Sequence, residues 1–347
     1  MKILINTPDL SLPGGVANHY KGLLPYWSEE VKYNFVGGRK GIPGFLMLPY
    51  DYIKFTLLCL FNKVDVVLLN PSLGKTALKR DALFLRIAKR FGIKTLIFIH
   101  GWDEEVEVKI NKTSKLFQSF LLADGFFVLA TEFKEKLISW GVTVPVWLTS
   151  TKVDDRLLQD FSTSQKNKKS KKLLFLARVE KNKGIYIALE AFKKVQETNK
   201  ELAFQVAGSG SELAAAKIYC KDHHIENVIF SGNLNGEQLT NAFATSDIYI
   251  LPTYHGEGMP TSILEAMAFG LPIVSRPVGG LVDFFENDKM GYLVESLDPQ
   301  DFADKIILII NNSAKLSAMS QYNHNYAKQH FMASKVVKQL EEKIANV

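Results

Sequence analysis

The stretch Thr95-Leu96-Ile97-Phe98-Ile99 is a continuous apolar run, and Val64-Asp65-Val66-Val67-Leu68-Leu69 is nearly so. Runs of this kind are typical of strands in a parallel sheet that is buried on both faces. Outward from these two runs, strand-like and helix-compatible segments alternate along the chain. In the first half, the predicted strands are 2–6, 33–37, 64–70, 94–100 and 125–130, and the predicted helices are 15–28, 43–62, 75–91, 104–123 and 131–140.

A second series of alternating segments follows a polar, lysine-rich stretch at 160–172. Its predicted strands are 173–177, 203–207, 227–231, 247–251, 272–275 and 291–294. The alternation predicts an α/β protein with two Rossmann-like, doubly wound domains that face each other across a cleft. The expected parts are a first domain at 1–165, a linker at 166–172, a second domain at 173–320, and a C-terminal helix at 321–347 that packs back on the first domain.

The composition is that of an ordinary globular protein, with 347 residues, 47% of them hydrophobic, and a formal net charge of +6. The only cysteines, Cys59 and Cys220, lack metal-ligand spacing and are expected to be buried thiols in a reducing compartment. The N-terminus is expected to be a strand and not a signal peptide, and no apolar run reaches the ~20 residues of a membrane span. These features predict a cytoplasmic protein.

The positive charge lies in the first half of the chain and in the lysine-rich stretch. It indicates either a surface for an anionic membrane or a phosphate-bearing acceptor, or simply a solvated basic surface. Because the charge does not form a compact stripe with aromatic residues, nucleic acid is not an expected partner.

Two glutamates, Glu257 and Glu265, flank a Gly-Met-Pro turn between the predicted strand 247–251 and a predicted helix. Each carboxylate can accept hydrogen bonds from two neighbouring hydroxyls. Backbone N–H groups at the helix start can bind an anion, and proline suits a first helical turn. Gly258, Met259, Pro260 and Thr261 are expected to contact the donor. A ligand whose phosphates lie between two hydroxyl-bearing ends is a nucleotide sugar. An isolated glutamate pair, however, is more often structural.

Two further loops follow predicted strands. Arg178 and Lys183 bracket the loop after 173–177, where two fixed cations can stabilise the negative charge on a leaving diphosphate. Gly14 and Gly15 follow the first strand, where they allow close approach of a phosphate or sugar. Each pair alone is typical of an ordinary loop, and its place after a strand favours a site.

Taken together, these segments resemble the retaining GT-B glycosyltransferases of family 4. The resemblance covers nearly the whole chain and is strongest over 172–295. It is carried by Ala177-Arg178-Val179-Glu180-Lys181-Asn182-Lys183-Gly184, Ala207-Gly208-Ser209-Gly210, Phe230-Ser231-Gly232-Asn233-Leu234, the segment with Glu257 and Glu265, and Val278-Gly279-Gly280. Ala177 stands where the family more often has glycine. The resemblance implies transfer of a sugar from a UDP- or GDP-linked donor to a hydroxyl, with retained anomeric configuration.

The resemblance also implies roles for single residues. Glu265 would hold the ribose hydroxyls, Glu257 would hold the donor sugar, and His100 would position that sugar. Gly232 and Leu234 lie in a segment whose backbone would meet the nucleobase. The leaving phosphate would take the acceptor's proton, so no general base is expected. No metal or other cofactor is expected either, and the sequence carries no metal-binding motif.

The first domain is expected to bind the acceptor, a saccharide or a lipid-linked saccharide. Asn70, Ser72 and Lys75 follow the predicted strand 64–70 and are candidate contacts. Residues 69–76 end like an ATP-binding P-loop, but Leu69 stands where that motif requires glycine. His19, on the first predicted helix, faces either the cleft or the core.

The apolar, aromatic stretch 45–61 lies near four cations, Arg39, Lys40, Lys54 and Lys63. It could lie on an anionic membrane beside a lipid-linked acceptor, but packing in the core of the first domain is the favoured alternative. Two other functions stay open, a nucleotide-sugar epimerase and a non-catalytic acceptor-binding subunit. The nucleobase, the sugar and the acceptor also stay open, and polysaccharide assembly is expected by family analogy alone.

Overall fold

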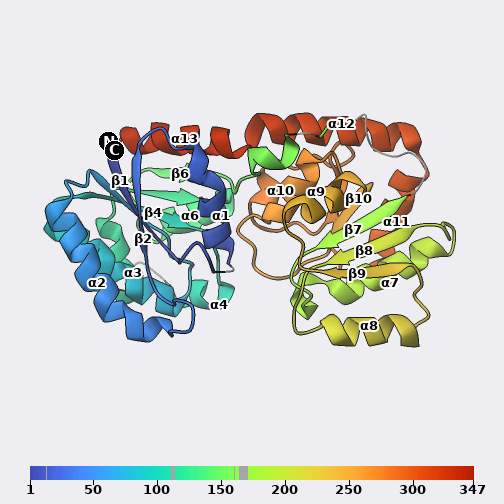
Figure 1. Cartoon of the computed structure of the whole chain (residues 1–347), viewed down its shortest axis with the longest axis horizontal. Helices are drawn as coiled ribbons and strands as arrows, with labels where there is room; N and C mark the ends of the chain where they lie inside the picture. Colours follow the sequence, from blue (N-terminus) through green and yellow to red (C-terminus); the bar gives the residue numbers. More distant parts are fainter. Residues whose placement is uncertain (13, 111–113, 160, 164–170) are drawn as a thin grey trace. The chain divides into compact units, whose positions relative to one another are not determined.

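The computed structural model describes residues 1–12, 14–110, 114–159, 161–163 and 171–347. The chain divides into two compact units. The N-terminal unit consists of Met1–Lys152, Gly256–Met259 and Ala333–Val347, and the C-terminal unit consists of Val153–His255 and Pro260–Met332. Each unit is built around its own six-stranded parallel sheet (Figure 1).

The sheet of the N-terminal unit has the strand order β2-β1-β3-β4-β5-β6. Its strands are β1 (Lys2–Thr7), β2 (Glu30–Phe35), β3 (Val66–Leu69), β4 (Lys94–Ile99), β5 (Gly125–Val128) and β6 (Val146–Leu148). β1 pairs with β2 on one side and β3 on the other, so the chain reverses its direction of winding there. Ligands of doubly wound sheets bind beyond the carboxyl ends of strands at such a point.

Helices cover both faces of this sheet. They are α1 (Gly15–Leu23), α2 (Gly44–Phe61), α3 (Lys75–Arg90), α4 (Glu104–Glu107), α5 (Lys115–Gln118), α6 (Thr131–Ser139) and α13 (Ala333–Ala345), with the 3-10 turns η1 (Leu24–Tyr26) and η2 (Ser119–Leu122). α2 and α3 lie on one side, where Phe55 and Phe84 pack with Val67 and other alternate strand residues, and α1 and α13 lie on the other (Figure 1). Burial on both faces explains the continuous apolar runs.

The sheet of the C-terminal unit has the order β12-β11-β10-β7-β8-β9. Its strands are β7 (Lys172–Leu176), β8 (Ala203–Ala207), β9 (Val228–Gly232), β10 (Ile248–Leu251), β11 (Ile273–Ser275) and β12 (Gly291–Leu293). Its helices are α7 (Ile185–Gln196), α8 (Leu213–Asp222), α9 (Gly236–Ala244), α10 (Thr261–Ala268), α11 (Pro299–Ile310) and α12 (Ser313–His330), with the 3-10 turns η3 (Asp155–Leu158), η5 (Lys181–Lys183) and η6 (Gly279–Asp283). The reversal lies between β7 and β10.

The α/β class with two doubly wound sheets is confirmed, as are the buried, free thiols of Cys59 and Cys220. Burial raises the pKa of the Cys59 thiol to about 12 and that of Cys220 to about 11. The strand β6 was not predicted. The helix expected over 104–123 is wrong, because separate short pieces carry Ile110 and Phe117 into the core.

The domain boundaries differ from the expectation. The C-terminal unit begins at Val153 and not after 165, because the Val153 N–H donates to Phe331 O at 2.7 Å. Most of the expected linker lies outside the described residues, and Lys172 already belongs to β7. Residues 321–332 belong to the C-terminal unit, since Asn323 Nδ2 donates to Leu271 O at 2.8 Å, and only α13 belongs to the N-terminal unit.

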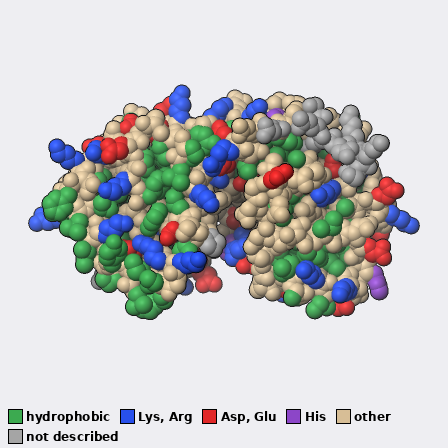
Figure 2. Space-filling view, viewed as in Figure 1, with side chains coloured by type: hydrophobic (Ala, Val, Ile, Leu, Met, Phe, Trp, Pro, Cys, Tyr) green, Lys and Arg blue, Asp and Glu red, His purple; other side chains and the backbone are tan. Residues whose placement is uncertain are grey.

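The apolar stretch 45–61 is the helix α2, and core packing accounts for one of its faces only. Phe55, Leu58 and Cys59 are buried. The other face carries an exposed apolar stripe, which we call the α2 stripe, made of Leu46, Tyr50, Ile53, Leu57 and Leu60. Figure 2 shows hydrophobic side chains gathered where Figure 1 places α2, with lysine and arginine among them.

Candidate functional site

The loops after three strands of the C-terminal unit converge at the point where its sheet reverses. The loop after β10 is tied to the loop after β7, because the Tyr254 N–H donates to Asn182 O at 3.0 Å and Thr253 Oγ1 to the same oxygen at 3.2 Å. The loop after β8 approaches the loop after β7 even more closely. A Cβ on Gly208, whose φ is +132°, would lie 1.9 Å from Ala177 O, so only glycine fits there.

The two predicted cations at this edge differ in environment. Lys183, in η5, is buried with 7% of its surface exposed. Arg178 is exposed, and its Nη1 lies 2.7 Å from Glu180 Oε1. Burial therefore restricts the movement of Lys183, and Arg178 can turn toward a ligand only by leaving its carboxylate partner.

The helix α10 starts at the same edge. Its first residue is Thr261, and Pro260 stands before it with no side chain capping the first N–H groups. Tyr249 Oη lies 2.7 Å from Ser262 Oγ and 2.9 Å from Leu176 O, which links the helix start to the end of β7. Glu265 is buried in α10, at 7% exposure. This helix start is open to an anion, and it lies one turn from a buried carboxylate.

The other predicted donor contacts in this unit lie at the same strand ends. Gly232 ends β9 with a φ of +65°, and its carbonyl accepts from the Gly208 N–H at 2.7 Å. Leu234 follows in the loop before α9 and is half-buried. His255, beside the glutamate loop, pairs through Nδ1 with Asn182 Nδ2 at 3.2 Å, so this histidine holds two loops together.

Glu257, Gly258 and Met259 belong to the N-terminal unit, unlike Pro260, Thr261 and Glu265. A Cβ on Gly258 would lie 2.3 Å from His100 O, so the absence of a side chain lets the loop rest on His100. Thr151 Oγ1 donates to Met259 O at 3.4 Å. The structure thus brings half-buried Glu257 to the loop of His100, which the sequence pattern alone did not indicate.

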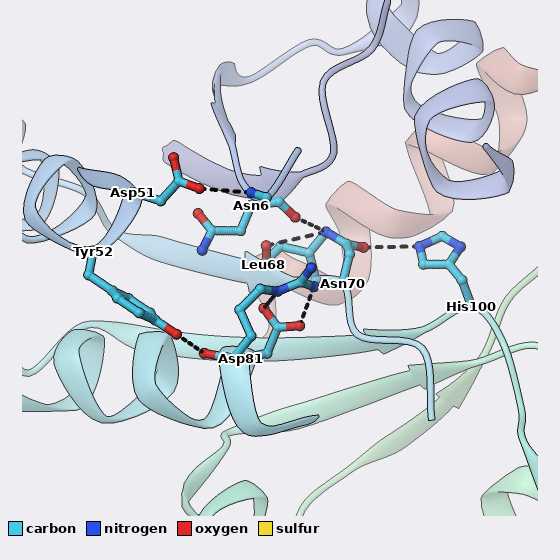
Figure 3. Close-up of polar contacts among 9 residues, drawn as sticks. Asn6, Asp51, Tyr52, Leu68, Asn70, Asp81 and His100 are labelled. Atoms are coloured by element: carbon cyan, nitrogen blue, oxygen red, sulfur yellow. Dashed lines mark hydrogen bonds and ion pairs between the residues drawn. The ribbon is translucent and has the colours of Figure 1, made fainter. Parts of the chain in front are cut away.

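His100 is fixed by a buried amide. Its Nε2 lies 3.0 Å from Asn70 Oδ1, and Asn70 Nδ2 donates to Asn6 O at 2.8 Å (Figure 3). Asn70 Oδ1 also accepts from Tyr20 Oη at 2.6 Å. The ring of His100 stacks on Phe98 with a centroid distance of 3.7 Å. Burial lowers the pKa of His100 to about 3. His100 is therefore neutral near pH 7, and the amide oxygen keeps its proton on Nε2, which leaves Nδ1 as an acceptor.

The predicted acceptor residues Asn70, Ser72 and Lys75 separate into two kinds. Ser72 and Lys75 are exposed, in agreement with a contact role. Asn70 is only 4% exposed, and its amide is occupied by Tyr20, His100 and Asn6, so direct contact with an acceptor is wrong and the side chain positions His100 instead. Sequence reasoning missed Tyr20, whose only signal was its place beside His19.

His19 is 2% exposed and lies beside His100, with ring centroids 5.0 Å apart. Neither ring nitrogen has a hydrogen-bond partner among the described residues. Burial, with smaller effects from the charges of His100 and Lys152, holds the pKa of His19 well below its usual value. Of the two orientations that the sequence left open, this side chain takes the buried one.

Gly14 and Gly15 precede and begin α1, and a Cβ on either would meet no atom within 4 Å. No packing within the described residues therefore requires glycine here, and the first turn of α1 has no side-chain cap. In the described part of the chain, no three His, Cys, Asp or Glu side chains form a group that could hold a metal ion. Independence from metal and cofactors stays a prediction.

Among known proteins, the matching family model covers residues of the C-terminal unit, whereas solved structures are similar over the whole chain. Residues 158–326 match the family model of glycosyl transferases group 1. The uncharacterized glycosyltransferase MJ1069 of Methanocaldococcus jannaschii is 28% identical over 182 residues, which are 52% of this chain and 46% of that protein. The amylovoran biosynthesis glycosyltransferase AmsK of Erwinia amylovora is 27% identical over 149 residues, 41% of this chain and 37% of that protein. This chain spans less than half the length of these curated relatives.

Among solved structures, Anabaena Alr3699/HepE in complex with UDP and glucose is similar over 100% of both chains, with a TM-score of 0.77 and 17% sequence identity. A sucrose-phosphate synthase from Thermosynechococcus elongatus has a TM-score of 0.76 and 15% identity, over 99% of this chain and 98% of that chain. At such identities the likeness speaks for the fold, which is the two-domain, Rossmann-like GT-B fold.

Proposed function

Because residues 158–326 match the family model of glycosyl transferases group 1, and the whole chain has the GT-B fold, we propose that it transfers a sugar from a nucleotide-diphosphate donor to a saccharide hydroxyl. The observation that carries the proposal is the edge where β7, β8 and β10 end. There an uncapped helix start lies in the same loop cluster as buried Lys183 and one turn from buried Glu265.

The donor binds by charge and hydroxyl geometry. The N–H groups at the start of α10 and the cations Lys183 and Arg178 hold the diphosphate. Glu265 accepts hydrogen bonds from the two ribose hydroxyls, and Glu257 accepts them from the sugar. His100 is neutral, so its Nδ1 accepts a hydrogen bond from a sugar hydroxyl and does not supply a proton.

Transfer proceeds with retention of the anomeric configuration. The bond between the anomeric carbon and the diphosphate breaks, and the acceptor oxygen attacks the same face. The leaving phosphate oxygen takes the proton of that hydroxyl, so the protein supplies no general base and no metal. Lys183 and Arg178 stabilise the negative charge that develops on the diphosphate, which is the largest contribution asked of the protein.

The direct test is incubation of the chain with UDP- and GDP-linked sugars and a panel of saccharide acceptors, followed by mass spectrometry. A product that contains donor sugar and acceptor supports the proposal, and NMR of its anomeric proton reports the configuration. Isomerised donor formed without acceptor would instead identify an epimerase. Acceptor binding without turnover of any donor would identify a non-catalytic subunit.

We further propose that α2 attaches the protein to the cytoplasmic face of an anionic membrane, in keeping with a lipid-linked acceptor and polysaccharide assembly. The α2 stripe repeats at intervals of three and four residues, so its members share one exposed helix face. The one acidic residue of α2, Asp51, is fully buried and pairs with Arg39 at 2.8 Å. Arg39 is therefore occupied, and Lys40, Lys54 and Lys63 remain as cations for lipid phosphates.

By length and composition α2 could cross a membrane, which alone is weak evidence. Because Phe55, Leu58 and Asp51 are packed into the unit, we expect the helix to lie flat on the surface. Sedimentation with vesicles of phosphatidylglycerol and phosphatidylcholine tests this. Combined serine substitution of Leu46, Ile53 and Leu57 should reduce bound protein at least about tenfold, since each buried side chain contributes about 1.5–3 kcal/mol. Serine at exposed Ile218 and Ile229 of the other unit is the control.

A further inference from the structure

Lys152 is a largely buried lysine to which the described residues supply no counterion. Its exposed fraction is 3%, and among the described residues no hydrogen bond or ion pair reaches its ammonium group. A charged side chain removed from water is costly unless a partner of opposite charge compensates it. Since the described part of the chain supplies no such partner to Lys152, a ligand is the natural source of one.

The helix α1 makes room for this side chain. A Cβ built on Gly22 would lie 2.2 Å from Lys152 Cε and 2.8 Å from Lys152 Nζ, so the lysine occupies the space that any other residue at 22 would fill. Gly22 is three residues from His19, so the two share a face of α1. The ammonium group is thus fixed against the helix that follows β1.

His19 supplies hydrogen-bonding capacity beside this cation. Both of its ring nitrogens are buried and unpartnered among the described residues. The charges that act on its pKa are those of His100 and Lys152, and no carboxylate is among them. A neutral imidazole still carries one N–H, which can donate to an anion.

Further unpartnered atoms lie at the same sheet edge. Among the described residues, the buried side-chain atoms without a partner include Asn6 Nδ2, Thr7 Oγ1 and Asn34 Oδ1, at the ends of β1 and β2. Asn6 Oδ1 accepts from Asn34 Nδ2 at 3.0 Å, and Asn6 O accepts from Asn70, which holds His100. Buried polar atoms are rarely left unpaired in a folded protein, so their concentration here points to a polar ligand.

We propose that Lys152 and His19 form a subsite for an anionic group, a carboxylate or a phosphate, carried by a sugar substrate. The inference rests on the proposed glycosyl transfer and names a class of substrate for it. Lys152 supplies the charge, and His19 supplies a hydrogen bond that a neutral sugar would use less well. Thr151, the neighbour of Lys152, bonds to the loop of Glu257, so the subsite adjoins the residues assigned to the donor sugar.

The test compares anionic and neutral sugars by isothermal titration of the full chain with glucuronate, glucose 6-phosphate and glucose, with and without UDP. We expect at least one anionic sugar to bind about tenfold or more tightly than glucose, the usual effect of one charge-assisted hydrogen bond. Glucuronate identifies a carboxylate and glucose 6-phosphate a phosphate. If UDP-glucuronate is preferred over UDP-glucose but the free sugars bind alike, the anion is carried by the donor.

Three variants locate the effect. Lys152→Met keeps the length of the side chain without its charge and should remove the preference. Gly22→Ala places a methyl group where Lys152 lies and should reduce the preference too, although alanine favours the helix. Lys21→Met removes an exposed lysine of the same helix and should change nothing.

Equal affinity for all these charged and neutral ligands, or a preference that survives in Lys152→Met, overturns the inference. Titration with UDP and with GDP separates this outcome from failure of the proposed function. A chain that binds either nucleotide without preferring anionic sugars keeps the function and loses the subsite. A chain that prefers anionic sugars without binding either nucleotide keeps the subsite and loses the function.

Discussion

The carboxyl edges of the two sheets differ in the charge of their side chains and in how many of their buried polar atoms have partners. In the C-terminal unit, the edge carries charged residues on loops that are tied together, with Lys183 and Glu265 buried and Arg178 paired with Glu180. In the N-terminal unit, the edge carries neutral histidines, amides and a buried lysine, and several buried atoms have no partner in the described chain. We infer that the edge of the C-terminal unit is formed before a nucleotide binds, whereas the unpartnered polar atoms of the N-terminal edge find their partners in a bound sugar.

The largest expected effect on this comparison is that of a substitution at Lys183. Lys183→Ala should lower kcat about 100- to 1,000-fold, because a fixed cation no longer meets the charge that develops on the leaving diphosphate. Donor turnover is the measurement, and circular dichroism verifies the fold. Lys181→Ala, which removes an exposed lysine of the same 3-10 turn, is the matched control. The site assignment is falsified if Lys183→Ala turns over like the wild type.

Glu265 tests the nucleotide end of the same edge. Glu265→Gln keeps the shape but removes the charge that accepts two ribose hydroxyls, so affinity for UDP should fall about 10- to 100-fold. Titration calorimetry measures the change, and exposed Glu295→Gln serves as the control. Unchanged affinity would return Glu265 to a structural role.

Asn70 tests the other edge. Asn70→Ala leaves Tyr20 Oη, His100 Nε2 and Asn6 O without their shared partner, which should lower the free energy of unfolding by about 2 kcal/mol. Urea unfolding measures the loss. A positioning role predicts in addition that kcat falls more than UDP affinity, and equal losses in both would contradict it.

The two histidines give this edge a dependence on pH. Burial lowers the pKa of His100 to about 3 and that of His19 well below its usual value, whereas both take up protons near pH 6.5 in an unfolded chain. Below pH 6.5 the unfolded chain takes up protons that the two folded histidines do not. The free energy of unfolding is therefore unaffected by them above pH 6.5 and falls below it, by up to about 1.4 kcal/mol per pH unit for each histidine.

Urea unfolding between pH 7 and 5 measures this slope, and His19→Gln should make it shallower. His223→Gln, at an exposed position of the C-terminal unit, should leave it unchanged. The same slope in wild type and His19→Gln would mean that His19 takes up a proton in the folded protein, against the neutral edge described above.

Much of the carboxyl edge of the sheet in the C-terminal unit could be predicted, because the sequence patterns that mark it involve residues close together in the chain. Apolar runs mark β7 and β10, glycines mark the loops, and Arg178, Lys183 and Glu265 stand at fixed short distances from them. A residue that follows a parallel strand must lie at the carboxyl edge of the sheet. The pattern was therefore sufficient to place these side chains in the correct loops.

The N-terminal edge could be predicted only in part. Asn70 and His100 follow strands and were identified as candidates. The role of Asn70 differs from the expected acceptor contact, since its side chain bonds to Tyr20 and His100 inside the unit. Lys152 carried no signal, because its burial depends on Gly22, far away in the sequence. The close approach of Gly258, the neighbour of Glu257, to the His100 carbonyl is likewise a long-range contact.

The sequence by itself determined the two α/β sheets, the buried thiols and the loops that carry charge, because strand periodicity and turn chemistry act between neighbours in the chain. Only the tertiary structure decided that the domain boundary falls at Val153, that α2 exposes an apolar stripe, and that a lysine is buried against α1. Burial is a property of packing between distant segments, and a side chain's partners, or their absence, appear only when those segments meet.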